Sequence, residues 1–410
     1  MQLHADELRA RLAPLFQENF EKFGEIGAAI SVWQNGKELL ELQGGFRDAR
    51  RKQPWTDDTL VLIWSATKGL GSACLLHVLQ EHKIDIERRV GELWPEFAPA
   101  GKEKITLAQL LSHQAGLAAL DRKVDILDYA AVMHALEKQE PNWPPGSAHG
   151  YHARTFGFLL DELVRRISGI TLAEYWRKTF AEPLKLDLWI GLPAEQNARV
   201  ATIYAAKTRK TADQNNRLSG SDQFYADVAT KGTFANKVFS SPHGLNAVSA
   251  MNKPEIRALP IVSFGGIGSA SSLGKFYAML ANGGSEPDGP LTETGHGRQF
   301  FSEQTSRWMA TTLTDGVDHV FQIPTAFSAG FMKDSAQTQR RLFGPSRGLL
   351  QVPVRLGPFG HPGAGGSHAF ADPENRISFA YVMNQMEQSI LPTEKSLRLV
   401  DAIYGLTPRL

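Results

Sequence analysis

The sequence predicts an α/β protein (α+β) in which strands from both ends of the chain complete one sheet and a mostly helical region lies between them. Near the N-terminus, the apolar runs Ala28 to Trp33 and Glu38 to Gln43 flank Asn35-Gly36, a dipeptide typical of hairpin turns. Near the C-terminus, a turn at residues 372–375 precedes the apolar run Ile377 to Met383. Strands at both ends therefore indicate a single sheet that needs both termini.

Helices are predicted where apolar residues recur with helical spacing. They are expected at Leu8–Phe20, just after Ser65, and at Leu107–Leu111, Ile126–Leu136, Phe156–Ile167, Leu172–Phe180, Leu273–Leu280 and Pro392–Tyr404. The polar segment 201–259 shows little periodicity and is expected to be loop-rich and near the site. We expect residues 1–90 and 262–410 to form the sheet domain, and residues 91–261 to form a mostly helical inserted domain that carries Tyr151.

Composition excludes several classes of function. The 410 residues are 42% hydrophobic and carry a net charge of +1, which makes nucleic acid an unexpected partner. The single cysteine, Cys74, rules out an internal disulfide and is expected to pack as a small apolar residue. No run of eighteen uncharged apolar residues predicts a membrane span, and the charged N-terminal stretch does not resemble a signal peptide. We therefore expect a cytoplasmic protein.

The stretch VLIWSATKGLGSACLLHVLQ, which begins at Val61, places Ser65 and Lys68 three residues apart where an apolar run turns into a helix. A serine in the first helical turn lies near exposed N–H groups, and a lysine three residues later can reach its oxygen. That amine becomes a base only if burial or a cationic neighbour lowers its pKa from ~10.4. The pair is therefore either a nucleophile with its base or a helix start with a solvated lysine.

Two other serines compete with Ser65. Ser272 and Lys275 have the same spacing, although Ser272 and the nearby Ser269 are typical of residues that cap a helix. Ser346 lies in GPSRG, which matches the nucleophile-elbow pattern but lacks the preceding buried strand and the following helix. Taken alone, none of these patterns identifies a nucleophile.

Further candidates lie in two loop segments. Tyr151 follows a Pro/Gly-rich turn and precedes an amphipathic helix, where it either shuttles a proton or fills the interior with its hydroxyl satisfied. The glycine-rich stretch FGHPGAGGSHAFADP permits the close backbone approach that an oxyanion site needs, but it also suits a plain turn. His149 and His152 flank Tyr151 without a nearby carboxylate, so no metal site is predicted, and no cofactor motif is present.

Taken in order, Ser65 with Lys68, then Tyr151, then HPG at His361 to Gly363 resemble the serine β-lactamase and penicillin-recognising enzyme superfamily. The closer likeness is to class C β-lactamase-like esterases, the family VIII carboxylesterases. It extends over most of the chain through SATKGL, LLSHQAGL, PPGSAHGYHARTFGFLLDELVRRISG and GHPGAGGSHAFADPENRISFAYVMN. It implies an antiparallel sheet, formed by both termini and flanked by helices, with a mostly helical second domain inserted. The resemblance favours Ser65 over the competing serines.

Residue by residue, the resemblance implies that Ser65 is the acylated nucleophile and that Lys68 is the adjacent base or proton relay. Tyr151 would be the family's general base and acid, and the choice of base between Lys68 and Tyr151 stays open. The oxyanion hole would consist of the backbone N–H groups of Ser65 and Ala364, the residue that follows Gly363.

Two departures bear on the substrate. Class C β-lactamases have an asparagine where this chain has Ala153, and a carboxylate-binding lysine where it has His361, which is mostly neutral at pH 7. Both changes disfavour an anionic β-lactam and leave ester chemistry intact. The resemblance thus implies a serine hydrolase that cleaves short- to medium-chain esters through an acyl-enzyme on Ser65, without a cofactor.

The alternatives are an acyltransferase of the same superfamily, a β-lactamase or peptidase, and a noncatalytic binding or assembly protein on the same scaffold. An acyltransferase would use the same chemistry up to acylation, and the polar segment 201–259 could hold its acceptor. The expected partner is a small-molecule ester rather than nucleic acid or a membrane, and homo-oligomer formation stays open.

Overall fold

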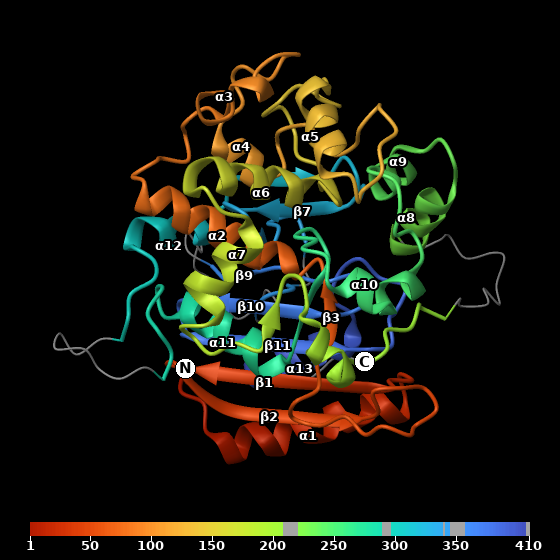
Figure 1. The fold of residues 1–410 in the computed structure, drawn as a ribbon. Helices are drawn as coiled ribbons and strands as arrows, with labels where there is room; N and C mark the ends of the chain where they lie inside the picture. The colour runs from red at the N-terminus through yellow and green to blue at the C-terminus, as the bar shows by residue number, and fades with distance from the viewer. Residues whose placement is uncertain (208–219, 289–296, 339–340, 345–356, 407–410) are drawn as a thin grey trace.

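A large antiparallel sheet forms the centre of the protein, and strands from both ends of the chain meet in it (Figure 1). A computed structural model describes residues 1–207, 220–288, 297–338, 341–344 and 357–406. The strand order is β2-β1-β11-β10-β9-β8-β7-β6, with the bounds β1 Gly27–Gln34, β2 Lys37–Gly45, β6 Thr314–Val317, β7 Pro324–Phe327, β8 Met332–Lys333, β9 Phe359–Gly360, β10 His368–Asp372 and β11 Ile377–Met383. Because β1 pairs with β11, Ile30 lies opposite Tyr381. The predicted fold class is confirmed.

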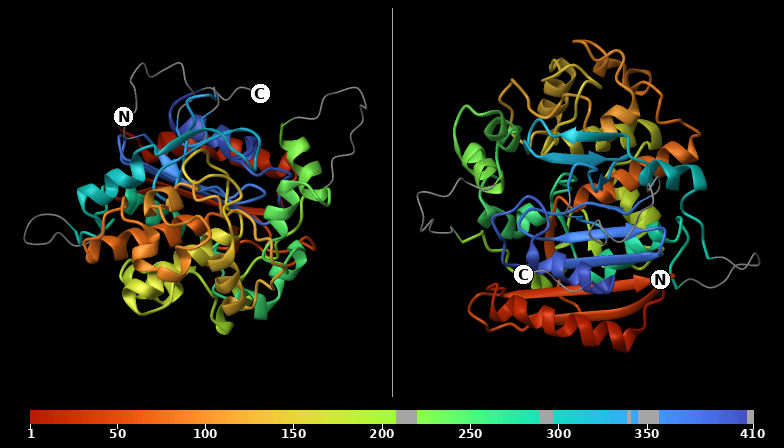
Figure 2. Two further views of the ribbon diagram at one scale, coloured as in Figure 1. Left: turned by 90° about the horizontal axis from the view of Figure 1, so that it is seen from above. Right: turned by 180° about the vertical axis from the view of Figure 1, so that it is seen from behind.

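Helices cover both faces of this sheet and gather at one end of it (Figures 1 and 2). Their bounds are α1 Ala5–Glu21, α2 Thr67–Glu81, α3 Val90–Leu93, α4 Leu107–Leu111, α5 Tyr129–Lys138, α6 Thr155–Ser168, α7 Leu172–Trp176, α8 Gly220–Ala229, α9 Phe234–Ser240, α10 Pro254–Arg257, α11 Ala270–Ala281, α12 Glu303–Ala310 and α13 Glu394–Ile403. A π-helical turn, Arg177–Ala181, continues α7. Every helix that the periodicity predicted is present. No helix in the described ranges is long and apolar enough to cross a membrane.

Alternate residues of the C-terminal strands enter two different cores. On β10, Ala369 and Ala371 join the core that contains α2 and α11, whereas Phe370 joins the core that contains α1 and α13. Successive side chains of a strand point to opposite faces, so a strand buried on both faces is apolar throughout. The alanines let α11 lie close on one side, and the larger side chains fill the space under the terminal helices on the other.

The polar segment 201–259 is more helical than expected. It contains α8, α9 and α10, so the loop-rich prediction is wrong over these three ranges. Phe224 of α8 packs edge-to-face against Phe239 of α9, with 5.4 Å between ring centroids. Such short helices depend on tertiary contacts and leave a weak periodic signal. Residues 208–219 of the segment lie outside the described residues.

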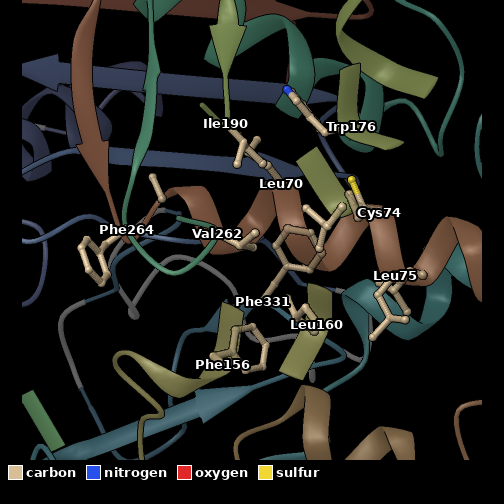
Figure 3. Close-up of a cluster of buried hydrophobic side chains, with 14 of the residues drawn as sticks. Leu70, Cys74, Leu75, Phe156, Leu160, Trp176, Ile190, Val262, Phe264 and Phe331 are labelled. Atoms are coloured by element: carbon tan, nitrogen blue, oxygen red, sulfur yellow. The ribbon is translucent and has the colours of Figure 1, made fainter. Parts of the chain in front are cut away.

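A second, three-stranded sheet positions the start of α2. It consists of β3 Val61–Trp64, β5 Gly266–Gly268 and β4 Leu188–Trp189, in the order β3-β5-β4. α2 is buried along most of its length, and Cys74 lies among apolar side chains such as Leu160 of α6, as predicted (Figure 3). The division into domains at residues 90 and 262 stays a prediction.

Candidate active site

Ser65 lies in the tight connection between β3 and α2. The preceding Trp64 has a left-handed backbone conformation, with φ of 51°, which is rare for a large side chain. The Thr67 hydroxyl donates a hydrogen bond to the Trp64 carbonyl oxygen at 2.5 Å, and the Lys68 N–H donates to the Ser65 carbonyl oxygen at 2.9 Å. The helix itself begins at Thr67. This sharp reversal leaves the Ser65 side chain half-buried beside a cavity.

Lys68 is completely buried next to Ser65. Its Nζ donates hydrogen bonds to Ser65 Oγ at 3.3 Å, to the Ala153 carbonyl oxygen at 2.9 Å and to the Ser263 carbonyl oxygen at 2.7 Å. Within the described ranges, no carboxylate forms an ion pair with it. Burial without a counter-charge disfavours the ammonium form, so the pKa of Lys68 is well below the ordinary lysine value.

Tyr151 lies in the segment that precedes α6. It lines a small cavity together with Ser65, and Lys68 Nζ lies 4.8 Å from its ring centroid. Its ring stacks on Phe321, with centroids 4.8 Å apart. Burial and the nearby Asp318 raise the pKa of Tyr151 above its ordinary value, although the Ser65 side chain acts in the other direction. The phenol is therefore neutral near pH 7.

Asp318 holds the Tyr151 turn in place. Its Oδ1 accepts hydrogen bonds from the Tyr151 N–H at 3.2 Å and from the Val320 and Phe321 N–H groups at 2.7 and 2.9 Å. The Thr325 hydroxyl donates to Oδ2 at 3.2 Å. Burial raises the pKa of Asp318 to about 6. The sequence analysis missed this residue, because an aspartate that accepts from the N–H groups two and three residues later is common in turns and carries no functional signal.

The glycine-rich segment lies against Ser65 between β9 and β10. A Cβ on Gly363 would lie 2.2 Å from the Ile63 carbonyl oxygen, so only glycine permits this approach to β3. Ala364 follows at the cavity wall. Within the described part of the chain, the backbone N–H groups of Ser65 and Ala364 have no hydrogen-bond acceptor. Both residues line the same two cavities.

His361 is a neutral side chain in this arrangement. It is 2% exposed, its Nδ1 lies 2.9 Å from the Pro362 carbonyl oxygen, and its Nε2 has no hydrogen-bond partner among the described residues. Burial, together with the nearby Lys68, lowers the pKa of His361 to about 3. It lines a small cavity with Ser65 and Tyr151, whereas Ala153 lines a larger cleft with Ser65.

The other candidates have structural contacts. His152 Nε2 accepts from the Leu117 N–H at 2.9 Å, and Nδ1 lies 2.7 Å from the Gly150 carbonyl oxygen, so both ring nitrogens are occupied. His149 lies between two threonine hydroxyls. The described residues contain no group of three or more side chains that could hold a metal ion.

Ser269 and Ser272 lie at the start of α11. Ser269 caps α11, as predicted, and Ser272 Oγ accepts a hydrogen bond from the Asp187 N–H at 2.8 Å. The GPSRG serine, Ser346, lies outside the described residues.

Comparison with known proteins agrees with this geometry, because residues 16–400 match the family model described as Beta-lactamase. The chain belongs to the beta-lactamase family. The resemblance predicted from the three motifs is therefore confirmed. The chain is 29% identical over 383 residues to the esterase/beta-lactamase LipL of Mycobacterium tuberculosis, covering 91% of this chain and 80% of that protein.

Solved structures give the same result over the whole chain. A penicillin-binding protein homologue from Caulobacter crescentus is 31% identical, with a TM-score of 0.79 and 99% of both chains covered. A family VIII carboxylesterase is also 31% identical, with a TM-score of 0.81 and 99% of both chains covered. The protein is a hydrolase of the beta-lactamase fold with esterases among its relatives.

Proposed function

We propose that this protein is a serine carboxylesterase that cleaves short- to medium-chain esters through an acyl-enzyme on Ser65. The observation that carries the proposal is the set of groups around one hydroxyl. Ser65 has the Lys68 amine at 3.3 Å, Tyr151 in the wall of the same cavity, and backbone N–H groups of Ser65 and Ala364 without an acceptor among the described residues. Relatives described as an esterase/beta-lactamase and a family VIII carboxylesterase support the same chemistry.

Lys68 acts as the base in the first step. Burial lowers the pKa of Lys68 and raises that of Tyr151, so the free amine is easier to form than the tyrosinate. The amine takes the proton of Ser65, and the serine oxygen attacks the ester carbonyl carbon. The negative charge that develops on the carbonyl oxygen is stabilised by the N–H groups of Ser65 and Ala364, each such donor being worth ~10²–10³ in rate.

Tyr151 acts as the proton donor to the departing alcohol. Its hydroxyl gives a proton to the alkoxide oxygen as the carbon–oxygen bond breaks, and it recovers a proton from the Lys68 ammonium. In the second step, water attacks the acyl carbon while Tyr151 and Lys68 accept its proton. Ser65 then leaves with a proton, and the free carboxylic acid departs.

Anionic β-lactams suit this site less well than neutral esters. His361 is uncharged at pH 7 because the pKa of its buried ring is about 3, so it supplies no cation for a carboxylate. Ala153 has no side-chain amide for the acyl-amide group of an antibiotic. Turnover of the β-lactam nitrocefin at a rate equal to ester turnover would contradict this part of the proposal.

The proposal is tested with p-nitrophenyl butyrate and the variants Ser65→Ala and Ser272→Ala, the second serving as a matched serine control. We expect the wild type to release p-nitrophenol and to carry a butyryl adduct on the peptide that contains Ser65. Activity of Ser65→Ala should fall by about 10⁴-fold or more, and Ser272→Ala should keep most of it. Equal activity of folded Ser65→Ala and wild type, checked by circular dichroism, would overturn the proposal. Product analysis with added alcohols separates hydrolysis from acyl transfer.

A further inference from the structure

Ser65 lies at the junction of two cavities of very different size. The larger cleft has a volume of about 360 Å³ and the smaller cavity one of about 20 Å³. Ser65 and Ala364 line both. The serine oxygen and one of the free N–H groups therefore lie between the two spaces, where the carbonyl group of a bound ester must be.

The walls of the two spaces differ in chemistry. The larger cleft is lined mainly by apolar and amide side chains, with one arginine and no carboxylate. Besides Ser65 and Ala364, its lining residues are Trp64, Ala153, Arg154, Val228, Asn236, Phe239, Ser240, Leu245, Asn246, Val248 and Phe264. The smaller cavity is lined by Tyr151, His361, Phe239, Phe321, Met332, Pro362 and Ile390. Tyr151 thus belongs to the smaller cavity alone.

Arg154 fixes the shape of the larger cleft. Its guanidinium donates to the carbonyl oxygens of Pro242 at 2.7 Å and of Gly244 at 2.5 Å, and to the side-chain oxygen of Asn246 at 3.1 Å. These bonds tie the loop that carries Leu245 and Asn246 to the residue next to Ala153. Arg154 therefore fixes the part of the wall that Leu245 and Asn246 form.

Proton transfer decides which part of the ester enters which space. When Ser65 Oγ bonds to the carbonyl carbon and the carbonyl oxygen faces the free N–H groups, the two remaining substituents point into the two spaces. The bond that breaks joins the carbonyl carbon to the alcohol oxygen, and this oxygen must receive a proton from a group within hydrogen-bond reach. Tyr151 is that group, and it lines only the smaller cavity.

We propose that the acyl part of the substrate occupies the larger cleft and the alcohol part the smaller cavity, so that the preferred substrates are esters of a small alcohol with a bulky, mostly apolar acyl group. The inference rests on the proposed function, because it uses Tyr151 as the proton donor to the alcohol. The smaller cavity has about 20 Å³ against about 360 Å³ for the larger cleft, so a bulky alcohol part fits it less well than a small one.

Two isomeric esters test the assignment, because they exchange the positions of the same groups. Methyl 4-phenylbutanoate has the bulk in the acyl part, and 3-phenylpropyl acetate has it in the alcohol. Acid release by the wild type is followed by titration at constant pH. We expect kcat/KM to be roughly tenfold or more higher for the methyl ester, which is within the discrimination that an apolar pocket provides.

Each of the two spaces is tested by one variant. Val248→Trp fills the larger cleft at a half-buried position and should lower kcat/KM for methyl 4-phenylbutanoate more than for 3-phenylpropyl acetate. Ile390→Ala widens the smaller cavity, also at a half-buried position, and should raise kcat/KM for 3-phenylpropyl acetate. Circular dichroism and thermal unfolding check that each variant is folded.

Equal kcat/KM values for the two esters or a preference for 3-phenylpropyl acetate would overturn the inference. So would changes in kcat/KM of the two variants opposite to those expected. p-Nitrophenolate leaves without a proton donor, so the butyryl adduct on Ser65 forms whichever space holds the alcohol. A Ser65 adduct with the wrong ester preference therefore contradicts this inference alone. Absence of the adduct contradicts the proposed function.

Discussion

Lys68, beside Ser65, and Lys395, where the two ends of the chain meet, are both almost completely buried, but their amines have opposite kinds of partner. Lys68 Nζ contacts a hydroxyl and two carbonyl oxygens. Lys395 Nζ on α13 lies 3.0 Å from Glu25 Oε2, and the two side chains are 2% and 0% exposed. The same Glu25 oxygen accepts a hydrogen bond from the Tyr381 hydroxyl at 2.6 Å.

The difference teaches what turns a buried lysine into a base. A carboxylate partner stabilises the ammonium ion, so Lys395 joins α13 to the start of β1 as a fixed ion pair. Lys68 has only neutral oxygens around it, and the loss of hydration favours its amine. Burial alone does not make a base useful, however. Lys333 also contacts only carbonyl oxygens, and burial lowers its pKa to about 7, but it lies in neither of the cavities that Ser65 lines.

The largest expected effect comes from removing the Lys68 amine. Lys68→Met keeps the volume of the side chain and deletes the base, so kcat/KM for p-nitrophenyl butyrate should fall by about 10³–10⁴-fold. Thermal unfolding and circular dichroism check that the variant is folded. Activity within tenfold of the wild type would remove Lys68 from the role of base and leave Tyr151 as the candidate.

Breaking the terminal ion pair should affect stability and leave chemistry unchanged. Lys395→Met leaves Glu25 buried without its cation, which should lower the free energy of unfolding by about 3–5 kcal/mol. kcat/KM at 25 °C should stay near the wild-type value. Urea unfolding provides the measurement, and the double variant Glu25→Gln with Lys395→Met should recover much of the loss because no unpaired charge remains. A single variant as stable as the wild type would contradict the comparison.

The pH dependence of kcat/KM should show the lowered pKa of Lys68. Below that pKa the ammonium form cannot accept the Ser65 proton, so activity should rise about tenfold per pH unit and level off once the amine predominates. Because burial lowers the pKa, the plateau should begin well below the ordinary lysine value of 10.5. A profile from pH 5 to 10 with p-nitrophenyl butyrate makes the measurement. A rising limb centred near the ordinary value would show that Lys68 is not the titrating group.

The smallest expected effect belongs to Lys333. Lys333→Met should leave kcat/KM within about threefold of the wild type, because its amine donates hydrogen bonds to the carbonyl oxygens of Ala310 and Gly357 and the residue lines neither cavity. The same p-nitrophenyl butyrate assay gives the result. A loss as large as that of Lys68→Met would mean that a buried lysine affects catalysis through the fold. The loss of activity in Lys68→Met would then not identify Lys68 as the base.

The amino-acid sequence by itself determined the main helices and strands and the three motifs of the site. Alternating and helical periodicities depend only on neighbouring residues, so the terminal hairpins and α4, α6 and α11 could be predicted from them. The three motifs, at Ser65 with Lys68, at Tyr151 and at His361 to Gly363, could be recognised in the sequence in the same way. They predicted membership of the beta-lactamase family, which is confirmed. The short helices α8 and α9 were missed, because their stability comes from packing against each other.

Only the tertiary structure decided what surrounds Ser65. The carbonyl oxygen of Ser263, 195 positions from Lys68, has no side-chain signature, and neither does the free N–H of Ala364. The hydrogen bonds of Asp318 to the Tyr151 turn also join residues that are distant in the sequence. A pKa depends on burial and on which charges lie nearby, and the partition of space around Ser65 depends on every wall at once. Both are properties of chain segments brought together by folding, which local sequence patterns do not encode.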